Sequence, residues 1–272
     1  MNAIANEPFD FDVSRWPELP RMKGLFVTGT DTGVGKTLIA GAIARSLRRS
    51  GRNVEVFKPV ATGCRRSRGQ LVSEDAEFLA ACADSKLMLA EIAPLRFSAA
   101  VAPNVAAERE GRVVDLEAIF SGYRRIAELA EAVVVEGVGG LLCPISGDFW
   151  VIHLAAMMKL PTVIVAEAGL GTINHSLLTI HAAKSARLDV AGVVVNRYLL
   201  EPPGAVSAGA PPKLKNDNEL AMYTNPSQIA ARGHLAVLAI VPEEPANSVS
   251  RGIIGPDTRF AIDQVDWPSI MG

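Results

Sequence analysis

A glycine-rich stretch with a lysine and a threonine, GTDTGVGKT over residues 29–37, is the part of the sequence best suited to binding phosphate. It follows a short apolar run and precedes a helical pattern, a context in which backbone N–H groups and a helix N-terminus can surround phosphate groups. Gly33 and Gly35 would let the backbone approach a ligand closely. Lys36 could reach β- and γ-phosphate oxygens, and Thr37 could offer a hydroxyl to Mg²⁺. A glycine-rich turn without a ligand is the alternative, which the Gly-Lys-Thr sequence disfavours.

Two carboxylates are candidates for holding the metal ion that accompanies a nucleotide. Glu136 follows an apolar strand pattern over residues 133–135, and the carboxyl ends of parallel strands face the ligand crevice. An ordinary strand-end acid would explain Glu136 equally well. Asp75 opens a helical pattern, where the helix dipole alone favours a carboxylate. From its spacing alone, Asp75 is better explained as a helix-start acid than as a metal ligand.

Two further polar residues end predicted strands. Lys58 would leave the sheet at the same edge as the glycine-rich loop and could be a second cation near phosphate, although a lone lysine is usually a solvated surface charge. Asn196 could contact a nucleotide base or cap its own strand. The Asn-Lys-x-Asp pattern that reads guanine is absent, because the chain continues as Asn196-Arg197-Tyr198-Leu199. This sequence favours adenine over guanine.

Apolar runs rich in β-branched residues alternate with helical patterns along the chain. The strand runs are almost continuously apolar, which is typical of parallel strands covered on both faces. The alternation predicts a doubly wound α/β domain. Strands are expected over residues 25–27, 54–57, 133–135, 162–165, 190–195 and 235–241, and helices over 36–50, 74–83, 115–131, 174–186 and 227–232.

The composition is that of a globular chain. Its 272 residues are 49% hydrophobic and 21% charged, with a net charge of −2, so neither nucleic acid nor a membrane is an expected partner. We expect an N-terminal extension over residues 1–22, which could be flexible, and a single domain over 23–272 with a proline-rich insertion at about 201–220. The extension lacks the pattern of a signal peptide, no run reaches a membrane span, and the three cysteines are widely spaced. These features predict a cytoplasmic protein. The spacing of the four histidines does not indicate a metal site.

Six motifs occur in the order found in the ATP-dependent dethiobiotin synthetases, P-loop ligases of biotin biosynthesis, which the chain resembles over about residues 23–245. They are GTDTGVGKT (29–37), KPVATG (58–63), Asp75, VEGVGG (135–140), GLGTINH (169–175) and Asn196. The loop is one residue longer than the usual eight-residue pattern, and that longer form is the family's own. The resemblance implies a three-layer P-loop NTPase-like α/β fold, with a mostly parallel central sheet flanked by helices.

The resemblance also implies a reaction. A Mg²⁺- and ATP-dependent ligase would make dethiobiotin, ADP and phosphate from 7,8-diaminononanoate (7,8-diaminopelargonate) and CO₂, through a carbamate and a carbamic–phosphoric anhydride. Lys36 and Lys58 would be the catalytic cations, and Thr37, Asp75 and Glu136 the metal ligands. The nucleotide would be bound by Gly33, Val34, Gly35, Lys36, Thr37, Leu38, Asp75, Glu136, Gly137, Val138, Gly139, Asn196, Arg197, Pro242 and Glu243.

The family is a homodimer with substrate pockets at the interface. By resemblance, the segment over residues 170–174 would give backbone N–H groups to the substrate carboxylate from the other subunit. It begins a helical pattern, which suits an anion, although on residue type alone a plain helix cap is preferred. The implied substrate-binding residues are Thr32, Thr62, Leu170, Gly171, Thr172, Ile173 and Asn174.

Two other P-loop classes are alternatives. A partitioning or septum-site ATPase would be a nucleotide-driven switch on a surface, but its signature lysine is replaced here by Thr30-Asp31-Thr32. A cobyrinate-amidase-type ligase would need a glutaminase domain, for which too few residues follow Asn196. Three features depart from the resemblance, namely the extension over residues 1–22, the long loop over 201–220 and Arg197.

Overall fold

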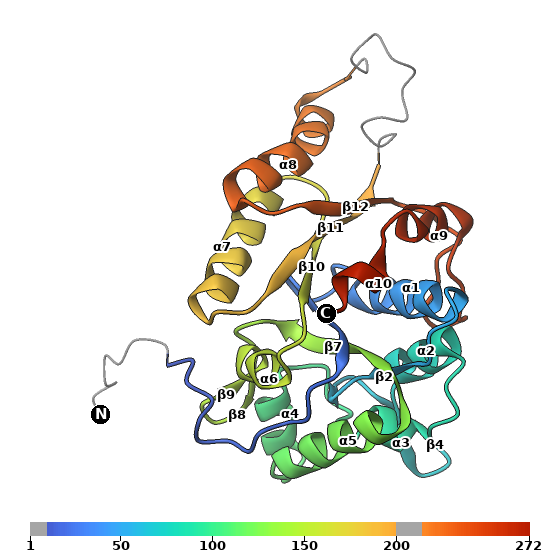
Figure 1. Cartoon of the computed structure of the whole chain (residues 1–272), viewed down its shortest axis with the longest axis vertical. Coiled ribbons are helices and arrows are strands. Elements are labelled where there is room, and N and C mark those ends of the chain that lie inside the picture. The colour runs from blue at the N-terminus through green and yellow to red at the C-terminus, as the bar shows by residue number, and fades with distance from the viewer. Residues whose placement is uncertain (1–9, 200–213) are drawn as a thin grey trace.

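The computed structural model describes residues 10–199 and 214–272, and its centre is a six-stranded sheet with helices on both faces (Figure 1). The strand order is β12-β11-β10-β1-β7-β2, and every neighbouring pair is parallel. This arrangement confirms the predicted α/β fold with a mostly parallel central sheet. The strands are β1 (Lys23–Gly29), β2 (Val54–Phe57), β7 (Ala132–Gly140), β10 (Thr162–Glu167), β11 (Val190–Tyr198) and β12 (Val237–Pro242).

The two faces of the sheet are covered by different helices. On one face, α1 (Lys36–Arg49), α2 (Glu74–Ala83), α9 (Pro256–Asp263) and α10 (Trp267–Ile270) pack into one apolar core. On the other face lie α5 (Leu116–Leu129), α6 (Val151–Met158), α7 (Thr172–Ser185) and α8 (Asp217–Gly233). Successive residues of β1 face opposite layers, because Leu25 and Val27 join the first core and Phe26 the second. The nearly continuous apolar pattern of the strand follows from this double burial.

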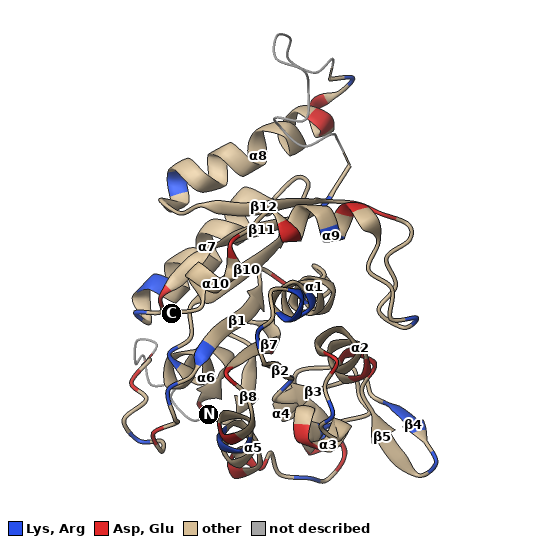
Figure 2. Ribbon diagram, turned by 45° about the vertical axis from the view of Figure 1, so that its right-hand side comes forward, with Lys and Arg blue, Asp and Glu red and all other residues tan. Residues whose placement is uncertain are grey.

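Short elements connect this frame. The two-residue strand β3 (Val60–Ala61) follows β2. Between α2 and α5 lie the helices α3 (Leu89–Ile92) and α4 (Pro103–Arg109) and the two-residue strand β6 (Leu95–Arg96). Two antiparallel hairpins project from loops, β4 (Arg65–Ser67) with β5 (Gln70–Val72) and β8 (Pro144–Ser146) with β9 (Phe149–Trp150). Acidic and basic positions are interspersed along the ribbon (Figure 2). Among the described residues, every helix is too short or too polar to span a bilayer.

The prediction of a helix over residues 227–232 places its start ten residues too late. Helix α8 begins at Asp217, where the side chain of Asn216 accepts a hydrogen bond from the Glu219 amide (3.0 Å), and Pro226 lies inside it. The last part of the expected insertion at 201–220 is therefore helical, and residues 200–213 lie outside the described part of the chain. Pro226 does not end the helix, because the cap at Asn216 and the packing of α8 on α7 stabilise it.

The described part of the expected N-terminal extension, residues 10–22, runs beside the β8–β9 hairpin and α6 before it enters the sheet as β1 (Figure 1). Its apolar side chains are partly buried against the core that α5 and α6 share. These side chains are Phe11, Val13, Trp16, Leu19 and Met22. This stretch of the extension is therefore packed on the rest of the protein.

Candidate active site

The glycine-rich loop joins β1 to α1, as predicted. Gly33 and Gly35 have φ angles of 82° and 94°, in the left-handed region that a residue without a Cβ adopts most easily. A Cβ on Gly35 would collide with the side-chain amide of Asn196. That amide donates a hydrogen bond to the carbonyl oxygen of Val34 (2.9 Å). Residue 35 must therefore be glycine both for its backbone angle and for the contact between the loop and β11.

The side chain of Lys36 folds back over the loop that precedes it. Its Nζ donates to the carbonyl oxygen of Asp31 at 2.8 Å, and the residue is only 7% exposed. Burial lowers the pKa of Lys36, while the carboxylate of Glu136 acts in the opposite direction. An anion bound beside Lys36 would therefore stabilise its charged form.

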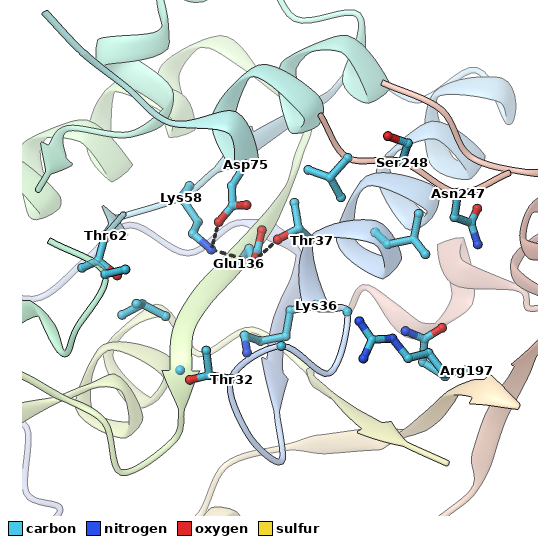
Figure 3. Close-up of a pocket in the computed structure, with 18 of the residues that line it drawn as sticks. Thr32, Lys36, Thr37, Lys58, Thr62, Asp75, Glu136, Arg197, Asn247 and Ser248 are labelled. Carbon is cyan, nitrogen blue, oxygen red and sulfur yellow. Dashed lines mark hydrogen bonds and ion pairs between the residues drawn. The ribbon is translucent and has the colours of Figure 1, made fainter. Parts of the chain in front are cut away.

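A buried cluster of charged and polar groups lies next to the loop (Figure 3). The Nζ of Lys58 lies 2.6 Å from Oε1 of Glu136 and 2.9 Å from Oδ2 of Asp75. The hydroxyl of Thr37 donates to the same Oε1 of Glu136 at 2.8 Å. Lys58 is 4% exposed and Glu136 is 1% exposed, so their contacts are shielded from water. The structure thus brings together four of the residues that the sequence singled out.

The charges of this cluster depend on one another. Burial alone would lower the pKa of Lys58, but the carboxylates of Glu136 and Asp75 raise it above its ordinary value. Burial opposes ionisation of Asp75, yet the Lys58 ammonium holds the pKa of Asp75 below its ordinary value. Lys58 is therefore a permanent cation here, and Asp75 is a carboxylate at neutral pH.

These groups line one elongated cavity of about 750 Å³ at the carboxyl edge of the sheet. In Figure 3, Thr62 lies toward one end, Lys36 and Thr37 near the middle, and Arg197 with Asn247 toward the other end. The predicted residues on its wall are Thr32, Gly33, Gly35, Lys36, Thr37, Leu38, Lys58, Thr62, Asp75, Glu136, Val138, Gly139, Asn196, Arg197, Pro242 and Glu243.

Some predicted residues do not line the cavity of this chain. Val34 is buried behind the loop and Gly137 packs against Phe26 and Val151. The segment over residues 170–174 begins α7 outside the cavity, and its Leu170 is 89% exposed. The segment therefore contributes nothing to the described cavity wall of its own chain.

The cavity also has walls that sequence reasoning missed. One is formed by residues 100–102, small apolar residues without any chemical signal. Another is the loop after β12, which contributes residues 244, 245 and 247–249. Since every parallel strand ends at the same edge, the loop after the last strand could have been predicted to reach the site. Cys143, in the turn after β7, had no such signal.

One end of the cavity is shaped by Arg197. This residue has a φ of 58°, and its guanidinium contacts Glu167 (2.8 Å) and Glu243 (3.8 Å). Asn196 beside it is 2% exposed and holds the phosphate loop through Val34. The end of β11 is thus tied both to the loop and to the segment after β12.

Comparisons with known proteins agree with this geometry. A family model described as an AAA domain matches residues 23–249. The chain is 40% identical over 224 residues to the ATP-dependent dethiobiotin synthetase BioD of Anaeromyxobacter sp. (strain K), covering 82% of this chain and 92% of the relative. It is 41% identical over 175 residues to the protein of that name from Bacillus subtilis (strain 168), covering 64% and 74%.

Solved structures with the same architecture have very different sequences. A ParA family ATPase from Chlorobium tepidum TLS matches with a TM-score of 0.54 and 11% identity, covering 90% of this chain and 97% of the other. The MinD cell division protein of Aquifex aeolicus matches with a TM-score of 0.55 and 16% identity, covering 92% and 97%. Such low identities show a shared fold alone. The relatives at about 40% identity decide the family, and the chain belongs to the ATP-dependent dethiobiotin synthetases.

Proposed function

We propose that the chain closes the ring of dethiobiotin from 7,8-diaminononanoate, CO₂ and ATP, releasing ADP and phosphate, and that residues 23–272 form one ligase domain. The observation that carries the proposal is the buried cluster in which Lys58 lies between Asp75 and Glu136 beside the phosphate loop. It places two lysines and two acids at the middle of one elongated cavity. The name borne by the relatives at about 40% identity supports the choice of substrates.

The residues of the cluster fit a magnesium ion. Thr37, Asp75 and Glu136 supply hydroxyl and carboxylate oxygens, the ligands that Mg²⁺ prefers. The second oxygen of Glu136 is buried and lacks a hydrogen-bond partner among the described residues, as expected of an oxygen that serves a metal ion or its water. We therefore assign Mg²⁺ to these three residues, partly through water at the two acids. When bound, the ion would offset negative charge on the phosphates.

The proposed reaction changes bonds in three stages. One substrate amine adds to CO₂ and loses a proton, which gives a carbamate. A carbamate oxygen attacks the γ-phosphorus and ADP leaves, which forms a carbamic–phosphoric anhydride. The second amine attacks the carbonyl carbon and loses a proton, phosphate leaves, and the cyclic urea closes. Lys36 and Lys58 would stabilise the charge of the carbamate and of the transferred phosphoryl group, where electrostatic positioning provides most of the catalysis.

We assign the two ends of the cavity to the two larger substrates. The base would lie at the end lined by Arg197, Pro242 and Glu243. The amide nitrogen of Asn196 already donates to Val34, so its side-chain oxygen would accept from the adenine amino group. Thr62, at the other end, would contact the diamine.

A second part of the proposal is that the active unit is a homodimer. The first turn of α7 lies outside the cavity of its own chain, although a helix N-terminus is suited to binding a carboxylate. We infer that residues 170–174 of one subunit complete the substrate site of the other.

Mixed dimers test this arrangement. Lys58→Ala would spoil a subunit's own site, and Ile173→Pro would remove an N–H from the first turn of α7, where no intrahelical bond is lost. Mixing the two inactive variants after exchange of subunits should restore about a quarter of wild-type activity, because half of the dimers contain one complete site. No recovery, with subunit exchange verified by mass, would contradict a shared site.

The reaction itself is tested by phosphate release from ATP with Mg²⁺ and bicarbonate, with and without 7,8-diaminononanoate. Release that depends on the diamine, with a product of the mass of dethiobiotin, is the expected result. Release that ignores the diamine but rises on a membrane or DNA surface would instead favour the partitioning-type switch.

A further inference from the structure

The N-terminal extension makes specific contacts with a histidine that is 1% exposed. His153, in the first turn of α6, accepts a hydrogen bond from the Trp150 amide at Nδ1 (2.9 Å). Its Nε2 must therefore carry the proton, and it lies 2.8 Å from the carbonyl oxygen of Asp10. The extension thus supplies the acceptor for a buried donor that would otherwise lack one.

Aromatic packing reinforces this contact. The ring of Trp16 meets that of Phe149 edge-on, with centroids 4.8 Å apart, and lies 5.0 Å from the His153 ring. Phe149 in turn stacks with His153 at 5.8 Å and contacts Phe120 of α5 at 6.0 Å. Trp16 therefore closes a cluster that joins the extension, the β8–β9 hairpin and two helices.

The hairpin leads directly to the cavity. The amides of Val151 and Ile152, which begin α6 directly after the hairpin, donate to the carbonyl oxygens of Cys143 (3.1 Å) and Leu141 (2.8 Å). Cys143 lines the cavity and packs against Gly139, which also lines it. Two backbone hydrogen bonds thus connect the aromatic cluster to the turn over residues 139–143.

That turn also borders the phosphate loop. A Cβ on Gly139 would lie 3.8 Å from the hydroxyl oxygen of Thr32, and Gly140 pairs with Gly29 in the sheet. The same segment includes the last two residues of β7, the strand that carries Glu136. A displacement of the turn would therefore reshape the cavity wall beside Thr32.

We infer that Trp16 is a positioning residue, through which the N-terminal extension holds the β8–β9 hairpin and thereby fixes the turn over residues 139–143 in the cavity wall beside Thr32. Trp16 is half-buried and is not among the described residues that line the cavity. Its effect on the site would pass through Phe149, His153 and the backbone. The turnover part of the test rests on the proposed function, whereas the exchange part does not.

Hydrogen–deuterium exchange of the full chain tests the inference in three variants. Trp16→Ala removes the ring, Trp16→Phe keeps a smaller ring, and Glu18→Ala is the control, since Glu18 is an exposed residue of the same extension. In Trp16→Ala the amides of residues 143, 151 and 152 should exchange about tenfold faster, as expected for the loss of an aromatic contact. Amides of β10 should exchange as in the wild type, and the two other variants should stay close to it.

Steady-state kinetics provide the second readout. In Trp16→Ala the KM for the diamine should rise about three- to tenfold, with a smaller change in the KM for ATP. Trp16→Phe should recover most of the loss, and Glu18→Ala should match the wild type.

Three results would overturn the inference. They are wild-type exchange at the three amides in Trp16→Ala, equal acceleration throughout β10, or faster exchange with unchanged KM values for both substrates. If the wild-type protein shows no diamine-dependent turnover, the proposed function fails separately and the exchange pattern alone decides the role of Trp16.

Discussion

Lys58 and Glu136 form a contact of 2.6 Å between groups that are almost completely buried. Lys58 directly follows β2, and Glu136 lies within the neighbouring parallel strand β7, one residue beyond the position that pairs with the end of β2. Asp75 reaches the same ammonium from the start of α2. Burying charged groups such as Lys58 and Glu136 is costly unless each has a partner. In return, the arrangement holds a cation in place for a negatively charged ligand such as phosphate.

The lysines should be essential for turnover but not for folding. In Lys58→Ala or Lys36→Ala, phosphate release should fall at least about 100-fold, because each loses a cation from the transferred group. The fold should survive the loss of Lys58, since burial and Asp75 already raise the pKa of Glu136, which can take up a proton. Activity and circular dichroism check this, with exposed Lys86→Ala as the control. Near-wild-type turnover in either variant would remove that lysine from catalysis.

The carboxylate of Asp75 should matter for the metal. We expect Asp75→Asn to need a several-fold higher Mg²⁺ concentration for half-maximal activity, since a neutral amide is a weaker ligand for a hard cation. Glu77→Gln is the matched control, because Glu77 lies on the same helix but pairs with exposed Arg65. A Mg²⁺ titration that Asp75→Asn leaves unchanged would exclude Asp75 from the site.

Asp75 should also give the protein a pH-dependent stability. Its pKa in the folded chain is below the ordinary value of 3.8. The stabilisation is therefore fully present above about pH 4 and is lost as the pH falls through the lower folded-state value. Urea unfolding at several pH values should show a gap between the wild type and Asp75→Asn that is largest near neutrality and shrinks in acid. A gap that stays constant down to pH 2 would mean that the contact with Lys58 does not lower the pKa of Asp75.

The contact between Gly35 and Asn196 should make residue 35 intolerant of a side chain. Gly35→Ala would place a Cβ against the Asn196 amide and strain a left-handed residue, at a combined cost of about 1–3 kcal/mol. Gly51→Ala is the control, because Gly51 has a φ of 86° and open space around its Cβ position. Thermal unfolding and the KM for ATP should change more in Gly35→Ala. Equal effects of the two substitutions would show that backbone strain alone matters.

Residues near the ends of strands could be predicted from the sequence, whereas residues placed by the packing of helices could not. Lys58 directly follows β2, and Glu136 and Asn196 lie one residue beyond the predicted ends of strands that in the structure continue to Gly140 and Tyr198. A parallel sheet gathers the carboxyl-terminal parts of its strands at one edge whatever the rest of the chain does. Asp75 could not be placed by spacing, because its position depends on how α2 packs beside α1. Its role came from the family resemblance, and the structure supplies the contact with Lys58.

Other parts of the molecule carry weaker sequence signals. The wall over residues 100–102 has no functional group, so only tertiary packing brings it to the cavity. Helix α8 begins at Asp217 with Pro226 inside it, although proline is usually confined to the first turn of a helix. The packing of Trp16 on Phe149 joins residues far apart in the chain, and neither periodicity nor composition encodes that pairing.

The transfer of one oxygen atom tests the proposed chemistry most directly. Turnover would be started with ¹⁸O-labelled CO₂ and diamine, and stopped before the label exchanges with water. If a carbamate oxygen attacks the γ-phosphorus, each phosphate released should carry one ¹⁸O atom from CO₂, and each dethiobiotin another. Unlabelled phosphate, formed at the same rate as dethiobiotin, would mean that water attacks the γ-phosphorus, and would contradict the role assigned to Lys36 and Lys58.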